Sequence, residues 1–311
     1  MEIDLHNKKL ILIQGPTASG KTGLSIALAK HFKTCIISAD SRQFYKEIAI
    51  GTAKPSVEEQ QGITHHFIDS HYLEDQVTAA QFAQEATAIM GKEFLSNDYL
   101  IVTGGSGMFV DAFVYGLDEL PTDEKVKAEI ERQKEEKGLE FLLQELASKD
   151  SAFYAAVDVK NPARIIRALE VIRITGEKIS EQRLGFKKHF NGKTIRLTIQ
   201  WNREDLYQRI HFRVDEMLQQ GLLNEVKSIS HLRHLKSLNT VGYKEVFAFL
   251  DGEYDWNTCV EKIKQHTRNY AKRQLTWMNR YPDVIQLSPY STESIFEQAI
   301  ASIENSDKFV E

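Results

Sequence analysis

The chain has 311 residues, of which 42% are hydrophobic and 27% charged, and its formal net charge is −5. This composition is typical of an ordinary globular protein, and the absence of any run of about 18 apolar residues excludes a membrane-spanning helix. The length exceeds what one hydrophobic core usually organises, so we expect one domain with an insertion, or two domains.

The first third of the chain alternates short apolar runs with helical patterns. We expect strands at Leu10 (LILIQ), Cys35 (CIIS) and Leu100 (LIVT), with a weaker one at His65 (HHFID). Helices are expected from Gly23 and from Thr78 between these runs. Nearly continuous apolar strands that alternate with helices indicate βαβ units, and therefore predict an α/β fold around a buried parallel sheet.

Beyond Pro121 the sequence becomes highly charged and helical in period, and strand-like sequence resumes only at Thr194 (TIRLTIQW) and Val284 (VIQL). The simplest interpretation is a helical insertion over residues 120–189 in a core domain made of residues 1–119 and 190–311. Two sequential domains are the alternative. We favour the insertion because the later strands could join the same sheet.

Charge is distributed unevenly along the chain. Residues 118–150 contain 11 acidic and six basic residues, whereas residues 160–213 contain 13 basic and five acidic ones. Residues 262–280 contain six basic residues and no acidic one. A folded chain with this pattern can present a positive face to phosphates despite its negative net charge, although a basic stretch by itself is more often a solvated surface.

Residues 15–22 read GPTASGKT, which fits the phosphate-binding pattern G-x-x-x-x-G-K-[ST] between a strand-like and a helix-like segment. The predicted diphosphate-binding residues are Gly15, Pro16, Thr17, Ala18, Ser19, Gly20, Lys21 and Thr22. Backbone N–H groups and the start of the following helix would hold phosphate oxygens, Lys21 would add a positive charge, and Thr22 would bind Mg²⁺. The loop indicates a polyphosphate ligand, and a kinase or nucleotide hydrolase remains open at this point.

The two cysteines, Cys35 and Cys259, have no metal-type spacing around them. We therefore expect neither a disulfide nor a zinc site, and we interpret Cys35 as a core residue. His65 and His66 are interpreted as structural histidines, because the nearby sequence offers no cysteine or carboxylate arrangement for a metal.

Several sequence blocks occur in an order that resembles the tRNA dimethylallyltransferases, also called isopentenyl-tRNA transferases. They are SADSRQFYKEIAIGTAKP from Ser38, HHFID from His65, VTGGSGMFVDAFVYGL from Val102, NPARIIRALEV from Asn161, YQRIHFRVDEML from Tyr207, NTVGYKE from Asn239 and RNYAKRQLTWMNR from Arg268. With the phosphate loop, these blocks span almost the whole chain. The resemblance implies transfer of a dimethylallyl group from dimethylallyl diphosphate to N6 of the adenosine 3′ of the tRNA anticodon.

The resemblance also implies catalytic roles for Asp40, Ser106 and Arg213. Asp40 follows the second expected strand, where α/β sheets place ligand-contacting residues, and would accept the N6 proton as a general base. Its alternative role is to order Mg²⁺ through water. Ser106 stands where many members of the family have threonine, and its hydroxyl would bond the leaving diphosphate. Arg213 would stabilise the charge that develops on that diphosphate.

Residues with an implied role in binding the anticodon stem-loop occur in both expected domains. They are Asp40, Ser41, Arg42, Gln43, Ser106, Lys127, Arg164, Arg167, Asn239, Thr240, Val241, Gly242, Tyr243 and Lys244. Arg164 and Arg167 are three residues apart on one expected helix face and could form a phosphate-contacting strip.

Other functions remain as alternatives. An adenylate prenyltransferase would share the phosphate loop but use AMP as acceptor, and a small-molecule kinase would transfer a phosphoryl group from ATP. A non-catalytic RNA-binding protein would have no need to keep Lys21 and Asp40. The basic blocks after Lys160 favour tRNA. The N-terminus lacks signal-peptide features, so we expect a cytoplasmic protein that is monomeric and not associated with a membrane.

Overall fold

The computed structural model describes residues 5, 7–117, 120–182 and 190–306. Two compact units are present, one made of Met1–Val114 and His189–Glu311 and the other of Tyr115–Lys188. The boundary positions expected from the sequence, 119 and 189, lie outside the described residues.

The larger unit contains a six-stranded sheet with the order β3-β2-β4-β1-β5-β6. Its strands are β1 (Lys9–Gln14), β2 (Ile36–Ser38), β3 (His65–His66), β4 (Tyr99–Gly104), β5 (Lys193–Ile199) and β6 (Ile285–Leu287). All neighbouring pairs are parallel. This confirms the α/β prediction. Because β5 pairs with β1 after the chain has passed through the smaller unit, that unit is inserted within the larger one.

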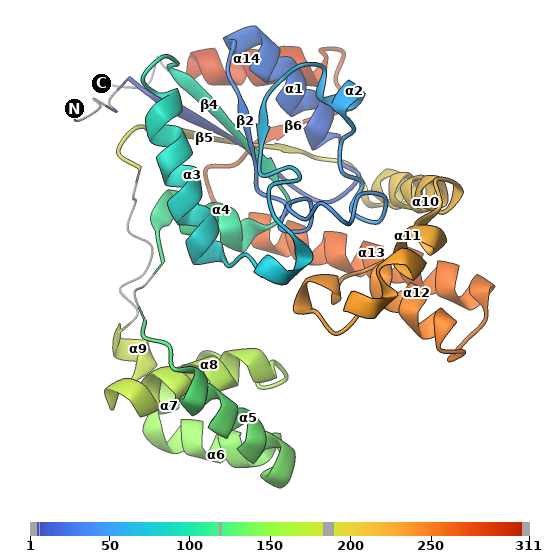
Figure 1. The fold of residues 1–311 in the computed structure, drawn as a ribbon. Helices are drawn as coiled ribbons and strands as arrows, with labels where there is room; N and C mark the ends of the chain where they lie inside the picture. Colours follow the sequence, from blue (N-terminus) through green and yellow to red (C-terminus); the bar gives the residue numbers. More distant parts are fainter. Residues whose placement is uncertain (1–4, 6, 118–119, 183–189, 307–311) are drawn as a thin grey trace. The chain divides into compact units, whose positions relative to one another are not determined.

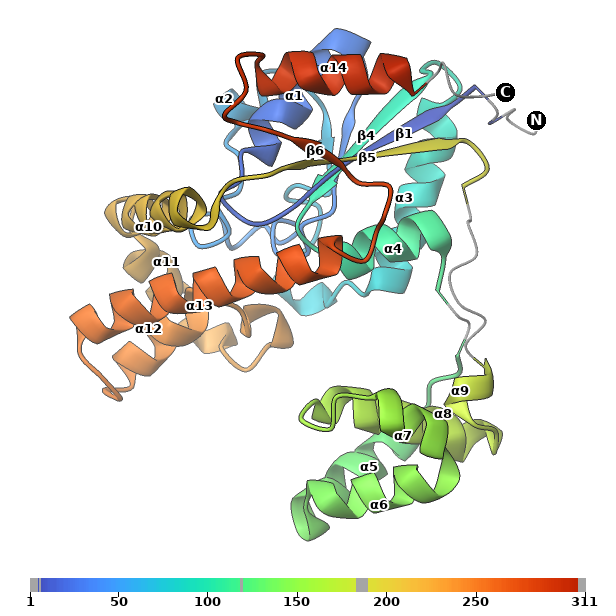
Figure 2. The same cartoon turned by 180° about the vertical axis from the view of Figure 1, so that it is seen from behind.

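Helices cover both faces of the sheet (Figures 1 and 2). α1 (Lys21–Phe32) and α14 (Ile295–Asn305) pack on one face, where Ile11, Leu28 and Ile303 belong to one hydrophobic cluster. α3 (Ala79–Glu93) and α4 (Gly107–Tyr115) lie over the opposite face. The strands are buried on both sides, which explains why their sequences are nearly continuous apolar runs.

The remaining helices of the larger unit mostly follow β5. They are α10 (Arg203–Gln219), α11 (Leu222–Ser228), α12 (Tyr243–Leu250) and α13 (Trp256–Met278), together with the short α2 (Val57–Gln60), η1 (Leu73–Asp75), η2 (Ser230–Leu232) and η3 (Lys236–Leu238). α13 packs against both α10 and α12. These contacts carry side chains from late in the sequence to the loops that follow the early strands.

The inserted unit is helical, with α5 (Glu124–Lys137), α6 (Leu139–Lys149), α7 (Ser151–Ala156), α8 (Pro162–Thr175) and α9 (Ile179–Gln182). Its own core includes Ile130, Leu146 and Leu169. Asp150 is fully buried, and its carboxylate accepts hydrogen bonds from the backbone N–H groups of Phe153 and Ser180. This buried carboxylate therefore caps α7 and ties α9 to it.

Candidate active site

The phosphate loop connects β1 to α1, as the sequence predicts. Gly15 and Gly20 have φ angles of +148° and +95°, a backbone conformation that L-residues with side chains rarely adopt. A Cβ atom at Gly15 would also lie 2.9 Å from Oγ1 of Thr198 on β5. Backbone conformation thus favours glycine at both positions, and close packing against β5 adds a second requirement at Gly15.

Three side chains, two of them from far along the chain, hold this loop. Arg209 Nε donates to the Ala18 carbonyl at 2.8 Å, and Trp201 Nε1 donates to the Ser19 carbonyl at 2.9 Å. Lys21 Nζ donates to the Pro16 carbonyl at 2.5 Å. Because these carbonyl groups are bonded to protein donors, the loop is fixed in shape before any anion arrives, as an anion cradle requires.

The Asp40 segment (residues 39–43) follows β2, and the GGSG segment (residues 104–107) begins at the last residue of the adjacent strand β4. Ser106 Oγ accepts from the Ser41 N–H and donates to Ser41 Oγ, each at 3.1 Å. The Arg42 N–H donates to Asp40 Oδ1 at 3.2 Å. The parallel pairing of β2 with β4 therefore places Ser106 beside the residue that follows Asp40.

Gln274 on α13 connects the phosphate loop to the GGSG segment. Its Oε1 accepts from the Thr17 N–H at 2.9 Å, and its Nε2 donates to the Gly105 carbonyl at 3.0 Å. A Cβ atom at Gly105 would lie 1.9 Å from that Nε2 atom, so glycine is needed for the approach. Gln274 is buried, and our sequence reasoning missed it.

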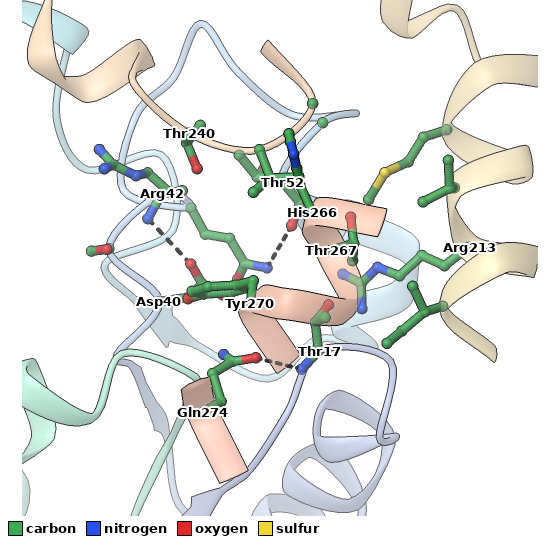
Figure 3. Close-up of a pocket in the computed structure, with 18 of the residues that line it drawn as sticks. Thr17, Asp40, Arg42, Thr52, Arg213, Thr240, His266, Thr267, Tyr270 and Gln274 are labelled. Carbon is green, nitrogen blue, oxygen red and sulfur yellow. Dashed lines mark hydrogen bonds between the residues drawn. The ribbon is translucent and has the colours of Figure 1, made fainter. Parts of the chain in front are cut away.

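These segments surround a cavity of about 440 Å³ (Figure 3). Its lining includes four of the candidate site residues, namely Lys21, Thr22, Asp40 and Arg213. One wall is apolar, with Ile210, Val214, Met217 and Ile263 in the lining. In Figure 3, Asp40 and Tyr270 lie beside each other, and Arg213 reaches toward them from α10. The cavity thus combines cations, a carboxylate and an apolar wall.

The two cations of the cavity, Lys21 and Arg213, are both buried. Burial, with the charge of Arg213 as a second cause, lowers the pKa of Lys21 to about 7, while the Asp40 carboxylate acts in the opposite direction. Burial also lowers the pKa of Arg213. Arg213 Nη2 donates to the Ala53 carbonyl at 3.4 Å, and its buried Nε has no partner among the described residues. Two crowded cations with a free donor provide a binding site for a multivalent anion.

The comparisons with known proteins agree with this geometry. The family model described as IPP transferase matches residues 43–281, and the tRNA dimethylallyltransferase of Cytophaga hutchinsonii is 43% identical over 91% of this chain and 93% of that protein. The chain belongs to the IPP transferase family. The structure of the full-length tRNA isopentenylpyrophosphate transferase from Bacillus halodurans has a TM-score of 0.70 at 32% identity, covering 97% of this chain and 98% of that one. A eukaryotic dimethylallyltransferase acting on tRNA has a TM-score of 0.81 at 27% identity, covering 97% of this chain and 79% of that one.

The lowered pKa of Lys21 predicts how this IPP transferase responds to pH. A bound diphosphate favours the protonated amine, so above pH 7 binding must take up a proton and becomes weaker as the pH rises. Above pH 7, we expect the Kd for inorganic diphosphate to increase by up to about tenfold more per pH unit in the parent protein than in the Lys21→Met variant. Titration calorimetry of both proteins from about pH 6 to 9 measures this difference. Equal pH slopes in the two proteins would contradict it.

Residues near the start of α12 were predicted to contact tRNA, and most of them line the cavity. Asn239, Thr240, Val241, Gly242 and Lys244 all do so. From the Asp40 segment, Ser41, Arg42 and Gln43 line it as well. Their contact with RNA remains a prediction, and the structure places these residues around the same cavity.

Arg42 and Gln43 also have partners within the protein. Arg42 Nη1 donates to the Ser237 carbonyl at 2.8 Å, and Gln43 Nε2 donates to the carbonyl groups of Thr52 and Ala53, both at 3.2 Å. Each side chain therefore fixes a neighbouring loop and faces the cavity at the same time.

The expectation that the Tyr243 side chain contacts tRNA has to be corrected. This side chain is completely buried, and its hydroxyl donates to Glu225 Oε1 at 2.5 Å. The Glu225 carboxylate also accepts from the N–H groups of residues 49, 50 and 51 at 2.7–2.9 Å. Burial of the aromatic ring thus gives Tyr243 a structural role, because it positions the acceptor that holds the loop after the Asp40 segment.

Replacing Tyr243 with phenylalanine is expected to destabilise the protein. The change removes a hydrogen bond to a carboxylate, which lowers the free energy of unfolding by about 1.5–3 kcal/mol. Urea unfolding measures the loss, with Tyr72→Phe as the matched control, because the Tyr72 side chain is exposed. Unchanged stability together with a loss of tRNA affinity would restore the original interpretation.

In the inserted unit, the three predicted tRNA-binding residues differ in their surroundings. Arg164 is exposed on α8, and Lys127 Nζ lies 3.6 Å from Glu124 Oε1 in a surface ion pair. Arg167 donates to the carbonyl groups of Leu120 and Pro121 and to Glu170 Oε2, at 2.8–2.9 Å. Arg167 therefore already holds the segment before α5, whereas Arg164 is exposed and accessible to phosphate.

Tyr270 is a second side chain that our sequence reasoning did not assign to the cavity. Burial and the Asp40 charge raise the pKa of its hydroxyl, which also interacts with Ser106. His266, Tyr270 and Gln274 are spaced four residues apart on α13 and all line the cavity. This i, i+4 spacing was a usable signal, because it places all three on one helix face.

Among the described residues, no helix has both the length and the apolar character needed to cross a lipid bilayer.

Proposed function

We propose that this chain transfers a dimethylallyl group from dimethylallyl diphosphate to N6 of the adenosine 3′ of the tRNA anticodon and releases diphosphate. The observation that carries the proposal is the position of Asp40 in one cavity with Lys21 and Arg213. A carboxylate suited to accept a proton then faces two cations suited to hold a leaving anion. The relatives named as tRNA dimethylallyltransferases support the same reaction.

In the proposed reaction, the diphosphate lies on the loop of residues 15–22 and the prenyl tail lies against the apolar wall. The N6 nitrogen attacks the primary allylic carbon, the C–N bond forms, and the C–O bond to diphosphate breaks. Asp40 accepts the proton that N6 loses, because the delocalised lone pair makes the neutral amine a weak nucleophile. Lys21, Arg213 and Ser106 stabilise the negative charge on the departing diphosphate.

We propose Mg²⁺ as the cofactor. The Thr22 hydroxyl and the Asp40 carboxylate line the same cavity, and oxygen ligands together with substrate phosphates are the ligands that Mg²⁺ prefers. When bound, the ion would neutralise part of the diphosphate charge. Thr22 is the residue that we expect to bind it directly.

The acceptor follows from the size and setting of the site. We propose that the anticodon loop enters through the side of the cavity lined by residues 239–242 and Lys244. The target base would leave its stack, which costs about a few kcal/mol. Arg164 and Lys127 of the inserted unit would bind backbone phosphates. One chain supplies all of these residues, so we propose a monomer, and the cytoplasm, where tRNA is found, is its expected compartment.

Incubation of the protein with total tRNA and labelled dimethylallyl diphosphate, followed by digestion to nucleosides, tests the proposal. We expect label in an N6-modified adenosine, and no label transfer from ATP. A parallel incubation with AMP in place of tRNA distinguishes the adenylate prenyltransferase alternative from tRNA modification. Label on AMP with none on tRNA would overturn the proposal, as would phosphoryl transfer from ATP.

A further inference from the structure

A second cluster of reactive side chains lies at the end of β2 opposite to Asp40. Cys35 immediately precedes β2, His66 ends the neighbouring edge strand β3, and Glu93 is the last residue of α3. The ligand atoms of the three side chains lie within 4.8 Å of one another. Cys35 is buried, and the other two are partly buried. The predicted transfer reaction has no use for this cluster.

Within the cluster, the Cys35 thiol forms a hydrogen bond with the Glu93 carboxylate. His66 Nε2 is buried and has no hydrogen-bond partner among the described residues. It lies 3.8 Å from Glu93 Oε1, which is too far for a hydrogen bond. The other oxygen, Glu93 Oε2, accepts from Asn97 Nδ2 at 3.1 Å. An amide therefore orients the carboxylate, as outer partners of metal ligands do.

We propose that Cys35, His66 and Glu93 bind one Zn²⁺ ion. Thiolate, imidazole and carboxylate are all common zinc ligands, and tetrahedral bonds of about 2.0–2.3 Å place ligand atoms about 3.3–3.8 Å apart. The cluster needs only small side-chain shifts to reach that spacing. The thiol releases its proton on binding, and the thiolate and carboxylate together balance the charge of the ion.

The fourth ligand is a water molecule. A surface pocket beside the cluster is lined by Cys35, Glu93 and Asn97, so it opens onto two of the three ligands. Lys33 also lines this pocket, but it is exposed and its charge is accessible to solvent. Solvent can therefore reach the ion on one side.

The ion would fasten the edge of the sheet. β3 has two residues and, among the strands of the described residues, pairs with β2 alone, so few backbone hydrogen bonds hold it. Zinc would join β2, β3 and α3 at one point, and β2 leads directly to Asp40. The expected role is to stabilise this edge, with no part in the chemistry of the transfer.

Titration calorimetry with ZnCl2 tests the proposal. The 311-residue protein is first freed of metal with a chelator and then kept in excess MgCl2 during the titration. We expect one Zn²⁺ per chain and an increase in Tm on binding. Cys35→Ser and Glu93→Gln should each weaken binding more than about 100-fold, and Asn97→Ala about tenfold. Co²⁺ should give the charge-transfer absorption of a cobalt–thiolate bond in the parent protein.

Cys259→Ser and His65→Gln are matched controls, because they change the same residue types outside the cluster, and both should retain zinc binding. Near-ultraviolet circular dichroism shows whether each variant is folded. If Cys35→Ser fails to fold, Glu93→Gln, which preserves the side-chain shape, is the variant that tests the proposal. Equal zinc affinity in the parent and in a folded cluster variant would overturn the proposal. Absence of the thiolate band or of stoichiometric binding would do so as well.

Discussion

Replacing Asp40 with asparagine is expected to lower kcat for prenyl transfer by about 10²–10⁴-fold, the usual contribution of a general base. Asparagine has nearly the same shape and retains an oxygen to accept the Arg42 N–H, but it cannot accept the N6 proton. Affinity for tRNA should therefore remain close to that of the parent protein. Single-turnover rates with labelled donor, together with tRNA binding by filter retention, separate the two quantities.

Asp98→Asn is the matched control for this experiment. Asp98 precedes β4 at the opposite end of the sheet, where it forms an ion pair with Lys8 at 2.8 Å. The same chemical change there should leave kcat unaltered. If Asp40→Asn retained the parent rate, the base would have to be another group, and Asp40 would be limited to ordering Mg²⁺.

Arg213→Gln is expected to lower kcat by about 10²–10³-fold, as the loss of a donor to a developing anion does. The guanidinium is held beside the phosphate loop with a buried Nε that lacks a protein partner. A neutral amide cannot balance the charge of the leaving diphosphate. Steady-state kinetics should show a lower kcat and weaker inhibition by diphosphate, with unchanged tRNA affinity.

Arg203→Gln is the control on the same helix. Arg203 is the first residue of α10, is exposed, and lies with its guanidinium carbon 5.2 Å from the centre of the Tyr207 ring. It should retain full activity. Arg213→Lys should recover only part of the rate, because an ammonium group lacks the planar fork of donors. Full activity of Arg213→Gln would remove this residue from the proposed chemistry.

The local sequence pattern was sufficient to predict features that depend on one short segment of the chain. The apolar runs predicted the strands, and the phosphate-loop motif lay between β1 and α1 as expected. The weak run at His65 became a two-residue edge strand. Charged helical sequence after Pro121 predicted the inserted unit, because amphipathic period depends on neighbours within a few turns.

The surroundings of individual side chains are what the sequence did not predict. Tyr243 belongs to a block that resembles tRNA-binding sequence, yet its ring is buried against the loop that contains Gly51. Arg167 is part of a basic strip, yet its guanidinium bonds two carbonyl groups and a carboxylate. Sequence alone does not tell which face of a helix is covered by segments that are far away in the chain.

The sequence by itself determined the fold class and the position of the phosphate-loop motif between β1 and α1, and it singled out Asp40, Ser106 and Arg213 as candidate catalytic residues, since ordered motifs carry that information. Only the tertiary structure decided which side chains meet. The strand order β2-β4-β1 brings Asp40, Ser106 and the phosphate loop to one edge, and α13 adds Gln274 and Tyr270 from more than 160 residues further on. The pairing of β2 with β3 brings Cys35 and His66 together at the other end of β2, beside Glu93 at the end of α3, where no spacing rule predicts a metal. Such long-range proximity depends on parallel pairing and helix packing, which leave no local pattern in the chain.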